Sequence, residues 1–291
     1  MARRARSSFL VDVDAGPYTV RGVSLGGIYT SLQVPQLGAL FDVGMPIRAF
    51  AGNDRIFLSH GHGDHAGALF GLLGIRGLLH RKVAPQVFLP EAIAPAIAEA
   101  IGAMERLPRH GLPVELVPMK AGDERQLRQD LWVRAFRTHH PVPSLGYLFF
   151  DRVKKLDPAL VGLPGPEIAR RKAAGEAIFA HQDRLELAYA TDTLVRVLET
   201  SPEIAKARVL ILECTFLDER KSLEASRAGC HIHLDELLEV ADRLENEHIV
   251  LMHFSQLYAP REVHAILAER LPPALAERVV PFAPPSGPWP G

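Results

Sequence analysis

One short stretch of the chain concentrates side chains that can bind a metal ion. Within six positions that follow the apolar residues 56–58 stand three histidines and an aspartate: His60, His62, Asp64 and His65. Neutral imidazole and carboxylate are ligands that zinc and similar divalent ions accept. A strand that ends in such a loop can direct several of these groups at one point. The alternative, a histidine-rich surface turn, would leave three histidines on a glycine-rich loop without a common purpose.

Further polar side chains follow apolar, strand-like runs later in the chain. Runs over 131–138, 185–190, 209–212 and 249–252 lead into His140, Asp192, Glu213 and His253. Helical patterns separate some of these runs, for example over 234–244, and this alternation predicts an α/β protein. In α/β sheets, sites form where the ends of strands meet loops. We therefore expect these side chains to join the 60–65 loop in one site.

The number of candidate ligands fits two metal ions. Two ions with four or five ligands each need about seven protein groups and a shared water. The chain offers seven: His60, His62, Asp64, His65, His140, Asp192 and His253. Asp192 is the natural bridge, because the two oxygens of a carboxylate can bind different ions. Two ions about 3.5–4 Å apart suit phosphate-ester hydrolysis by the bridging water, since they stabilise both attacking and leaving oxygens. The pattern predicts a dinuclear hydrolase.

Length and composition set wider limits. The 291 residues, 47% of them hydrophobic, suffice for one large domain with a substantial core. A net charge of −1 gives no support to a general nucleic-acid coat or a membrane-surface protein, although a local basic patch is compatible with it. No apolar run is long enough to span a bilayer, and the start is too short for a secretory signal. Cys214 and Cys230 make no disulfide framework, which favours a reducing, cytoplasmic location.

The domain organisation follows from composition. Residues 1–17 form a basic N-terminal extension, 18–280 the hydrolase domain, and 281–291 a loose tail rich in proline and glycine. Within the domain, residues 152–182 are basic and look like an excursion from the core. A solvated charged face is the alternative interpretation of that segment. A helix is expected to open directly after the histidine loop, over 66–73.

Several motifs together identify a family. The arrangement His60-x-His-x-Asp-His65 with a later His, Asp and His resembles the signature of the metallo-β-lactamase superfamily. Six further segments narrow the resemblance to the ribonuclease Z family of tRNA 3′-processing endoribonucleases, in its short plant-type form: Phe41-Asp-Val-Gly44, Thr138-His-His140, Ala190-Thr-Asp-Thr193, Glu213-Cys-Thr-Phe216, Gly229-Cys-His-Ile-His233 and His253-Phe-Ser255. The similarity covers residues 18–280. It implies a four-layer αβ/βα sandwich with two mixed sheets and a short inserted arm.

The resemblance implies a role for each candidate. One zinc would be held by His60, His62 and His140 and a second by Asp64, His65 and His253, with Asp192 between them and manganese or iron as alternative metals. Asp42 would orient the ligand loop, and Asp64 would also steer the attacking water. His231, supported by Glu213, would protonate or stabilise the leaving 3′ oxygen. His139 should point to the opposite face of its strand, and His233 is expected to be structural.

The inserted arm also gains a role from the resemblance. Its Gly-Pro segment is similar to the family's tRNA-binding arm, here in a shortened form, with the substrate residues Gly165, Pro166, Arg170, Arg171 and Lys172. The basic side chains would contact phosphates and position the tRNA rather than read bases. Because the arm of one subunit serves its partner's active site in that family, a homodimer is implied. Neither an organic cofactor nor a membrane is expected.

The expected activity is zinc-dependent removal of 3′ trailers from precursor tRNA. Attack of a metal-bound hydroxide on the phosphodiester would leave a 3′-hydroxyl on the tRNA. The alternative is a metal-dependent phosphodiesterase that acts on small or cyclic phosphodiesters with the same centre. A third hypothesis, a metal-bound RNA-binding or scaffold protein without turnover, is opposed by the complete ligand set.

Overall fold

Two sheets form the middle of the molecule. The computed structural model describes residues 9–107 and 111–290. In this part of the chain the first sheet has seven strands in sequential order: β1 Val11–Ala15, β2 Tyr18–Leu25, β3 Tyr29–Val34, β4 Ala39–Phe41, β5 Arg55–Phe57, β6 Gln86–Pro90 and β7 Glu115–Met119. Strands β1 to β4 pair antiparallel, whereas β4 to β7 pair parallel.

The second sheet has the same mixed design. Its described strands run in reverse order from β14 to β8: β14 Val279–Pro281, β13 His248–Met252, β12 Val209–Glu213, β11 Phe179–Ala190, β10 Leu145–Leu156, β9 Leu131–Arg137 and β8 Glu124–Gln126. Pairing is antiparallel from β8 to β11 and parallel from β11 to β14. Every residue of β12 is buried, as expected for a parallel strand covered on both faces.

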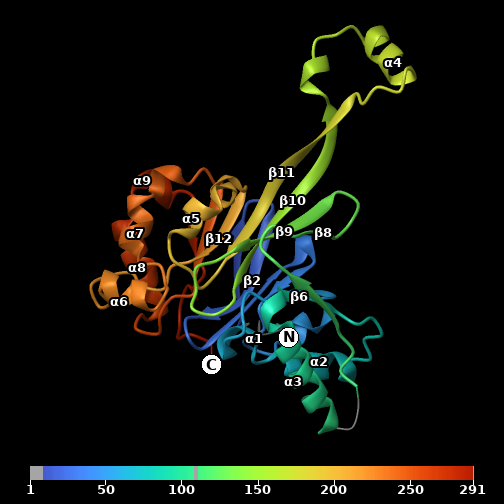
Figure 1. The fold of residues 1–291 in the computed structure, drawn as a ribbon. Coiled ribbons are helices and arrows are strands. Elements are labelled where there is room, and N and C mark those ends of the chain that lie inside the picture. Colours follow the sequence, from blue (N-terminus) through green and yellow to red (C-terminus); the bar gives the residue numbers. More distant parts are fainter. Residues whose placement is uncertain (1–8, 108–110, 291) are drawn as a thin grey trace, which may run out of the picture.

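Helices cover the outer face of each sheet (Figure 1). On the first sheet lie α1 Gly63–Ala66, α2 Leu69–Leu78 and α3 Ala94–Arg106, and on the second α5 Val197–Thr200, α6 Leu223–Ala228, α7 Leu234–Glu239, α8 Pro260–Arg270 and α9 Pro273–Ala276. Short 3-10 helices lie at Pro35–Leu37, Arg48–Gly52, Glu91–Ile93, Pro158–Leu160, Pro202–Lys206 and Ala241–Arg243. The result is the expected four-layer sandwich.

Three apolar clusters hold the layers together. The central one joins the inner faces of the two sheets and contains stacked aromatic rings, with Phe41 on Tyr189 at 4.4 Å between centroids and Phe57 on Phe88 at 4.6 Å. The other two lie between each sheet and its own helices. Such aromatic packing fixes the distance between the sheets, so loops at the ends of strands from both sheets are held in register.

A long ribbon leaves this core. Strands β10 and β11 pair antiparallel along their whole length, from Tyr147–Tyr189 near the core to Leu156–Phe179 at the far end. The end carries α4 Gly165–Ala173, which has no buried residue and lies well away from both sheets (Figure 1). The sequence placed the excursion at 152–182 but not its form, because the outer strands lack the apolar pattern by which a strand is recognised.

The base of the ribbon is braced by charge and aromatic contacts. The Arg152 guanidinium pairs with Asp183 at 2.8 Å and with Glu124 at 3.0 Å, and it lies over the Trp132 and Phe150 rings. These residues come from β8, β9, β10 and β11 together. The direction in which the ribbon leaves the sheet is therefore fixed by side-chain contacts at its base.

Some boundaries differ from the sequence-based expectation. Residues 11–15, assigned to the N-terminal extension, form the edge strand β1, while residues 1–8 lie outside the described part of the chain. The tail is packed rather than loose, since Phe282 is buried and Trp289 donates a hydrogen bond from Nε1 to the Tyr258 carbonyl at 2.7 Å. The helix expected over 66–73 is split into α1 and α2, and α7 is shorter than the pattern over 234–244.

Within residues 9–107 and 111–290, no helix is both long enough and apolar enough to cross a membrane.

Candidate metal centre

The histidine loop is held between β5 and α1. Its end is fixed from the neighbouring loop, where the Val43 N–H donates to the His65 carbonyl at 2.5 Å. Gly44 makes this approach feasible, because a Cβ there would lie 1.9 Å from the Asp64 carbonyl oxygen. The four-residue α1 then presents Asp64 and His65 side by side. Strand, loop and short helix together direct four candidate ligands toward one edge of the sheet.

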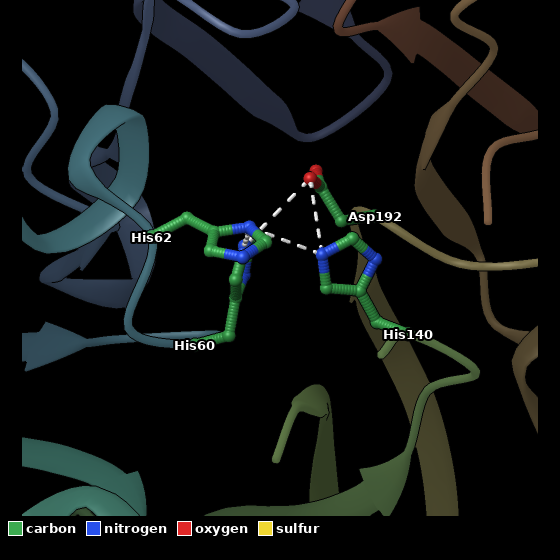
Figure 2. A group of neighbouring side chains, drawn as sticks. All are labelled: His60, His62, His140 and Asp192. Carbon is green, nitrogen blue, oxygen red and sulfur yellow. Dashed lines mark hydrogen bonds and ion pairs between the residues drawn. The ribbon is translucent and has the colours of Figure 1, made fainter. Parts of the chain in front are cut away.

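A first cluster joins this loop to the second sheet (Figure 2). His60 Nε2 lies 3.1 Å from His62 Nδ1, which in turn lies 3.2 Å from His140 Nε2. Asp192 Oδ2 faces the group, at 3.7 Å from His60 Nε2 and 3.9 Å from His140 Nε2. One donor atom from each of the four residues lies within 4.8 Å of the others, which is compatible with a shared ion.

A second cluster shares Asp192 with the first. His65 Nε2 lies 3.3 Å from His253 Nε2 and 3.3 Å from Asp64 Oδ2. Asp192 turns its other oxygen to this group, with Oδ1 at 3.3 Å from His65 Nε2 and 3.2 Å from His253 Nε2. The two oxygens of one carboxylate thus face two different sets of nitrogens. All seven residues that the sequence singled out as ligands lie in these two clusters.

Three site residues have unusual backbone conformations. Asp42, Asp192 and His253 adopt positive φ angles of 54°, 39° and 63°, and each lies immediately or shortly after the end of its strand. Non-glycine residues rarely adopt this region, and they persist there only where surrounding contacts hold them. The conformation turns each side chain back from its strand toward the site.

Asp42 organises the loop from behind. Its buried carboxylate accepts hydrogen bonds from the Ser59 N–H at 2.7 Å, the Ser59 hydroxyl at 2.8 Å, the Tyr189 hydroxyl at 2.6 Å and His65 Nδ1 at 2.8 Å. These donors belong to both sheets, so the carboxylate ties the histidine loop to β11. Sequence reasoning identified Asp42 but not Ser59 or Tyr189, which no local pattern distinguishes from ordinary core residues.

The hydrogen-bond relays fix the protonated nitrogen of three histidines. His65 donates from Nδ1 to Asp42. The Ser59 hydroxyl is also committed to Asp42, so at 2.9 Å it must accept from His60 Nδ1. In the same way Thr215 donates to Glu213 at 2.6 Å and accepts from His253 Nδ1 at 3.0 Å. In their neutral forms, each imidazole therefore presents the lone pair of Nε2 to the cluster, as a metal ligand must.

The charges of the site also suit a cation. Burial lowers the pKa of His60 to about 2, with the neighbouring His65 as a further cause. Burial likewise disfavours the charged form of His65, but the Asp192 and Asp42 carboxylates outweigh it and place the pKa of His65 well above its usual value. Burial acts to raise the pKa of Asp192, whereas the imidazoles of His253 and His65 hold it well below the usual value. The carboxylates around His65 thus favour positive charge in the second cluster, and a metal ion is favoured there for the same reason, while His60 is kept neutral, as a ligand must be.

His231 and Glu213 lie directly beside the clusters. His231 Nδ1 is 3.1 Å from Glu213 Oε1, and its ring stacks on His253 at 5.4 Å between centroids. The Glu213 carboxylate is completely buried and accepts from the N–H groups of Thr193 and Thr215. Its charge outweighs the effect of burial and raises the pKa of His231 to about 9. With 20% of its side chain exposed, His231 is accessible from solvent.

Other predicted residues lie outside the clusters. His139 points away, with Nε2 at 2.9 Å from the Thr200 hydroxyl, and His233 caps α7 by accepting at Nδ1 from the Asp235 N–H. The five arm residues Gly165, Pro166, Arg170, Arg171 and Lys172 lie on α4 at the end of the ribbon, remote from the clusters of their own chain (Figure 1). Thr215, which links Glu213 to His253, was missed; its motif was noted, but its hydroxyl gave no chemical signal.

Comparison with known proteins places this architecture among hydrolase folds. A family model described as "Beta-lactamase superfamily domain" matches residues 29–254. The chain is 36% identical to tRNase Z TRZ1 of Arabidopsis thaliana over 265 residues, which is 90% of this chain and 94% of that protein. It is 29% identical to ribonuclease Z of Thermobifida fusca, covering 80% and 79% of the two chains.

Solved structures agree on the fold. The short form of human tRNase Z superposes with a TM-score of 0.55 at 19% identity and covers 86% of this chain and 93% of that one. Zn²⁺-bound PqqB from Methylobacterium extorquens gives a TM-score of 0.60 at 12% identity, with 94% and 96% covered.

Proposed function

The chain belongs to the tRNase Z family of the β-lactamase superfamily, and from this premise we propose that it is a zinc-dependent endoribonuclease that removes 3′ trailers from precursor tRNA. The observation that carries the proposal is the convergence of seven nitrogen and oxygen ligands beside the His231–Glu213 pair. The first feature suits a metal-dependent phosphodiester hydrolase, and the second supplies a proton donor for the leaving oxygen.

The metal ligands divide into two groups. His60, His62 and His140 would hold one ion, and Asp64, His65 and His253 the other, with Asp192 shared through its two oxygens. Imidazole and carboxylate ligands suit zinc, with manganese or iron as alternatives. When bound, the two ions supply Lewis-acid stabilisation of the charge that develops on the phosphate oxygens.

The protein's own side chains handle orientation and proton transfer. Asp42 fixes the ring of His65, and Thr215 fixes that of His253, so neither ligand must reorient during the reaction. Asp64 is the centre's carboxylate with the larger exposed fraction, 14% against 4% for Asp192, and can orient an incoming water. His231 donates its proton to the departing 3′ oxygen, which leaves tRNA with a 3′-hydroxyl and the trailer with a 5′-phosphate.

The ribbon supports substrate binding at a distance. Its α4 exposes basic side chains beside Gly165 and Pro166, although Glu167 pairs with Arg170 at 2.7 Å and with Arg171 at 3.0 Å. These charges would contact tRNA phosphates and position the body of the substrate. Because α4 is remote from the metal centre of its own chain, it would act on tRNA bound at a partner's centre, in a homodimer (Figure 1). A cytoplasmic location is part of the same proposal.

An assay on a labelled precursor tRNA with a 3′ trailer tests the proposal. Zinc-loaded protein should release a mature-length tRNA that ends in a 3′-hydroxyl, and metal analysis should give two zinc ions per chain. Hydrolysis of bis(p-nitrophenyl) phosphate without any cleavage of precursor tRNA would refute the proposed substrate. Intact substrates of both kinds, with metal bound, would refute the proposed reaction as a whole.

A further inference from the structure

A groove opens beside the first metal cluster. It has a volume of about 460 Å³, within the roughly 300–1,000 Å³ typical of small-ligand sites. Its walls come from the ends of β6, β7 and β9 and the loops that follow them, and they include Lys120, Arg137, His140 and Ser144. His140 is shared with the metal cluster, so the groove is continuous with the centre, whereas His231 does not line it.

Of the two basic side chains that line this groove, Arg137 is the one without an ion pair in the part of the chain that the structure describes. Among residues 9–107 and 111–290, no side chain pairs with its guanidinium, and its side chain lies at the exposed end of β9. Lys120, on the opposite wall, is instead paired with Glu91 at 3.1 Å. An unpaired guanidinium presents a planar fork of donors that matches phosphate oxygens, so Arg137 is suited to bind a phosphodiester.

The remaining walls suit the rest of a nucleotide. Thr138 donates its hydroxyl proton to Ser144 at 2.6 Å, which leaves the Ser144 proton free for a ligand. Pro141, Val142 and Pro143 form an apolar wall of the groove. The pyrrolidine rings of the two prolines restrict the backbone and so keep this wall rigid. A base packed on such a wall makes van der Waals contacts but no base-specific hydrogen bonds, so binding would depend little on the RNA sequence.

We propose that this groove binds the trailer, with Arg137 paired to the phosphate that follows the first trailer nucleotide. The assignment rests on the proposed function, since cleavage leaves the scissile phosphate on the trailer. The leaving 3′ oxygen lies toward His231, and the trailer, joined to phosphorus through another oxygen, exits elsewhere. Arg137 and His140 are three residues apart, at most about 10 Å along an extended chain, so both reach one short stretch of RNA.

Trailer length provides the test. A trailer of one nucleotide lacks the phosphate assigned to Arg137, whereas a trailer of five nucleotides contains it. With zinc-loaded protein, Arg137→Ala should raise KM for the longer trailer roughly 10-fold, the order of one charge-assisted hydrogen-bonded pair. The slope of log kcat/KM against log salt should fall by about 0.7, as for one phosphate contact on a single strand. KM for the one-nucleotide trailer and hydrolysis of bis(p-nitrophenyl) phosphate should not change.

Two further variants act as controls. Arg137→Lys keeps the charge and should restore part of the effect. Arg128→Ala removes an exposed arginine beyond the opposite end of the same strand, and it should leave both trailers unaffected. Equal loss on the one-nucleotide and five-nucleotide trailers, or equal loss in Arg128→Ala, would overturn the assignment. So would a loss of ester hydrolysis in Arg137→Ala.

A binding measurement separates this proposal from the proposed function. A fluorescent, 5′-phosphorylated pentaribonucleotide should bind the zinc-loaded wild type, and Arg137→Ala should bind it roughly 10-fold more weakly. That result supports RNA binding in the groove even if no precursor tRNA is cleaved. In that case only the proposed function, with precursor tRNA as the substrate, would be wrong. If precursor tRNA is cleaved but wild type and Arg137→Ala bind the pentaribonucleotide equally well, the trailer site proposed for the groove is refuted and the proposed function stands.

Discussion

Replacing His231 by alanine should remove the proton donor while leaving the metal centre assembled. The ring packs against the rings of two ligands, His253 at 5.4 Å and His140 at 6.0 Å between centroids, and its hydrogen bonds go to Glu213 and Thr215. His60, His65 and His253 use Nδ1 in hydrogen bonds and would use Nε2 as metal ligands, so without His231 water would be the remaining proton donor at the leaving oxygen. General acid catalysis contributes about 10²- to 10⁴-fold, so kcat on precursor tRNA should fall by that factor, or about 3–5 kcal/mol of barrier.

The leaving group makes this prediction specific. A ribose 3′ oxygen needs a proton to depart, whereas p-nitrophenolate leaves readily without one. Hydrolysis of bis(p-nitrophenyl) phosphate by His231→Ala should therefore fall less than 10-fold, with zinc content by elemental analysis equal to wild type. His139→Ala, one position from a ligand but bonded to Thr200, is the matched control and should leave both activities unchanged. Equal loss on both substrates would refute the acid role, and loss of zinc would make His231 a ligand instead.

The pH profile checks the same role from another side. A general acid works in its protonated form, so activity should decline as pH rises through the pKa of His231, which Glu213 raises to about 9. In Glu213→Gln this carboxylate charge is gone while burial remains, so the alkaline limb should move to lower pH. An alkaline limb that stays in place would show that another group controls it.

Three more predictions concern support of the site and the ribbon. Asp42→Asn should weaken zinc binding about 10- to 100-fold, measured by competition with a chelator, and unchanged affinity would show that the relay does not orient its ligands. Arg152→Gln should lower the free energy of unfolding by about 1 kcal/mol at pH 7, after allowance for the partly exposed pair, when measured by urea titration. Arg152 holds the pKa of Asp183 below its usual value. The pair therefore contributes to the free energy of unfolding above about pH 4, the pKa of an aspartate in the unfolded chain, and this contribution is lost as pH falls. The variant should therefore approach wild type at acid pH, and a constant difference would contradict the pairing. Gly44→Ala should lose zinc, as measured by elemental analysis, since the added Cβ would collide with the Asp64 carbonyl. A variant that keeps its zinc would show that the loop can shift without displacing its metal ligands.

The sequence alone determined the chemistry of the site. Ligand type is a local property, and four of the seven donors stand within six consecutive positions, so the contiguous loop already indicated a metal. His140, Asp192 and His253 could be added because each follows an apolar strand, and parallel strands end at one edge of a sheet. The same pattern predicted the α/β class, whereas the excursion near 152–182 was predicted from its basic composition.

Only the tertiary structure decided how these residues work together. His65 and His253 are 188 residues apart, and their contact depends on the packing of two sheets through aromatic rings rather than on spacing. That packing also chose which imidazole nitrogen carries the proton, through Asp42, Ser59 and Thr215, and it turned the two oxygens of Asp192 toward different clusters. It left Arg137 unpaired in a groove beside His140. Such features arise where several distant segments meet, and hydrogen bonds that cross between sheets leave no periodic trace in the sequence.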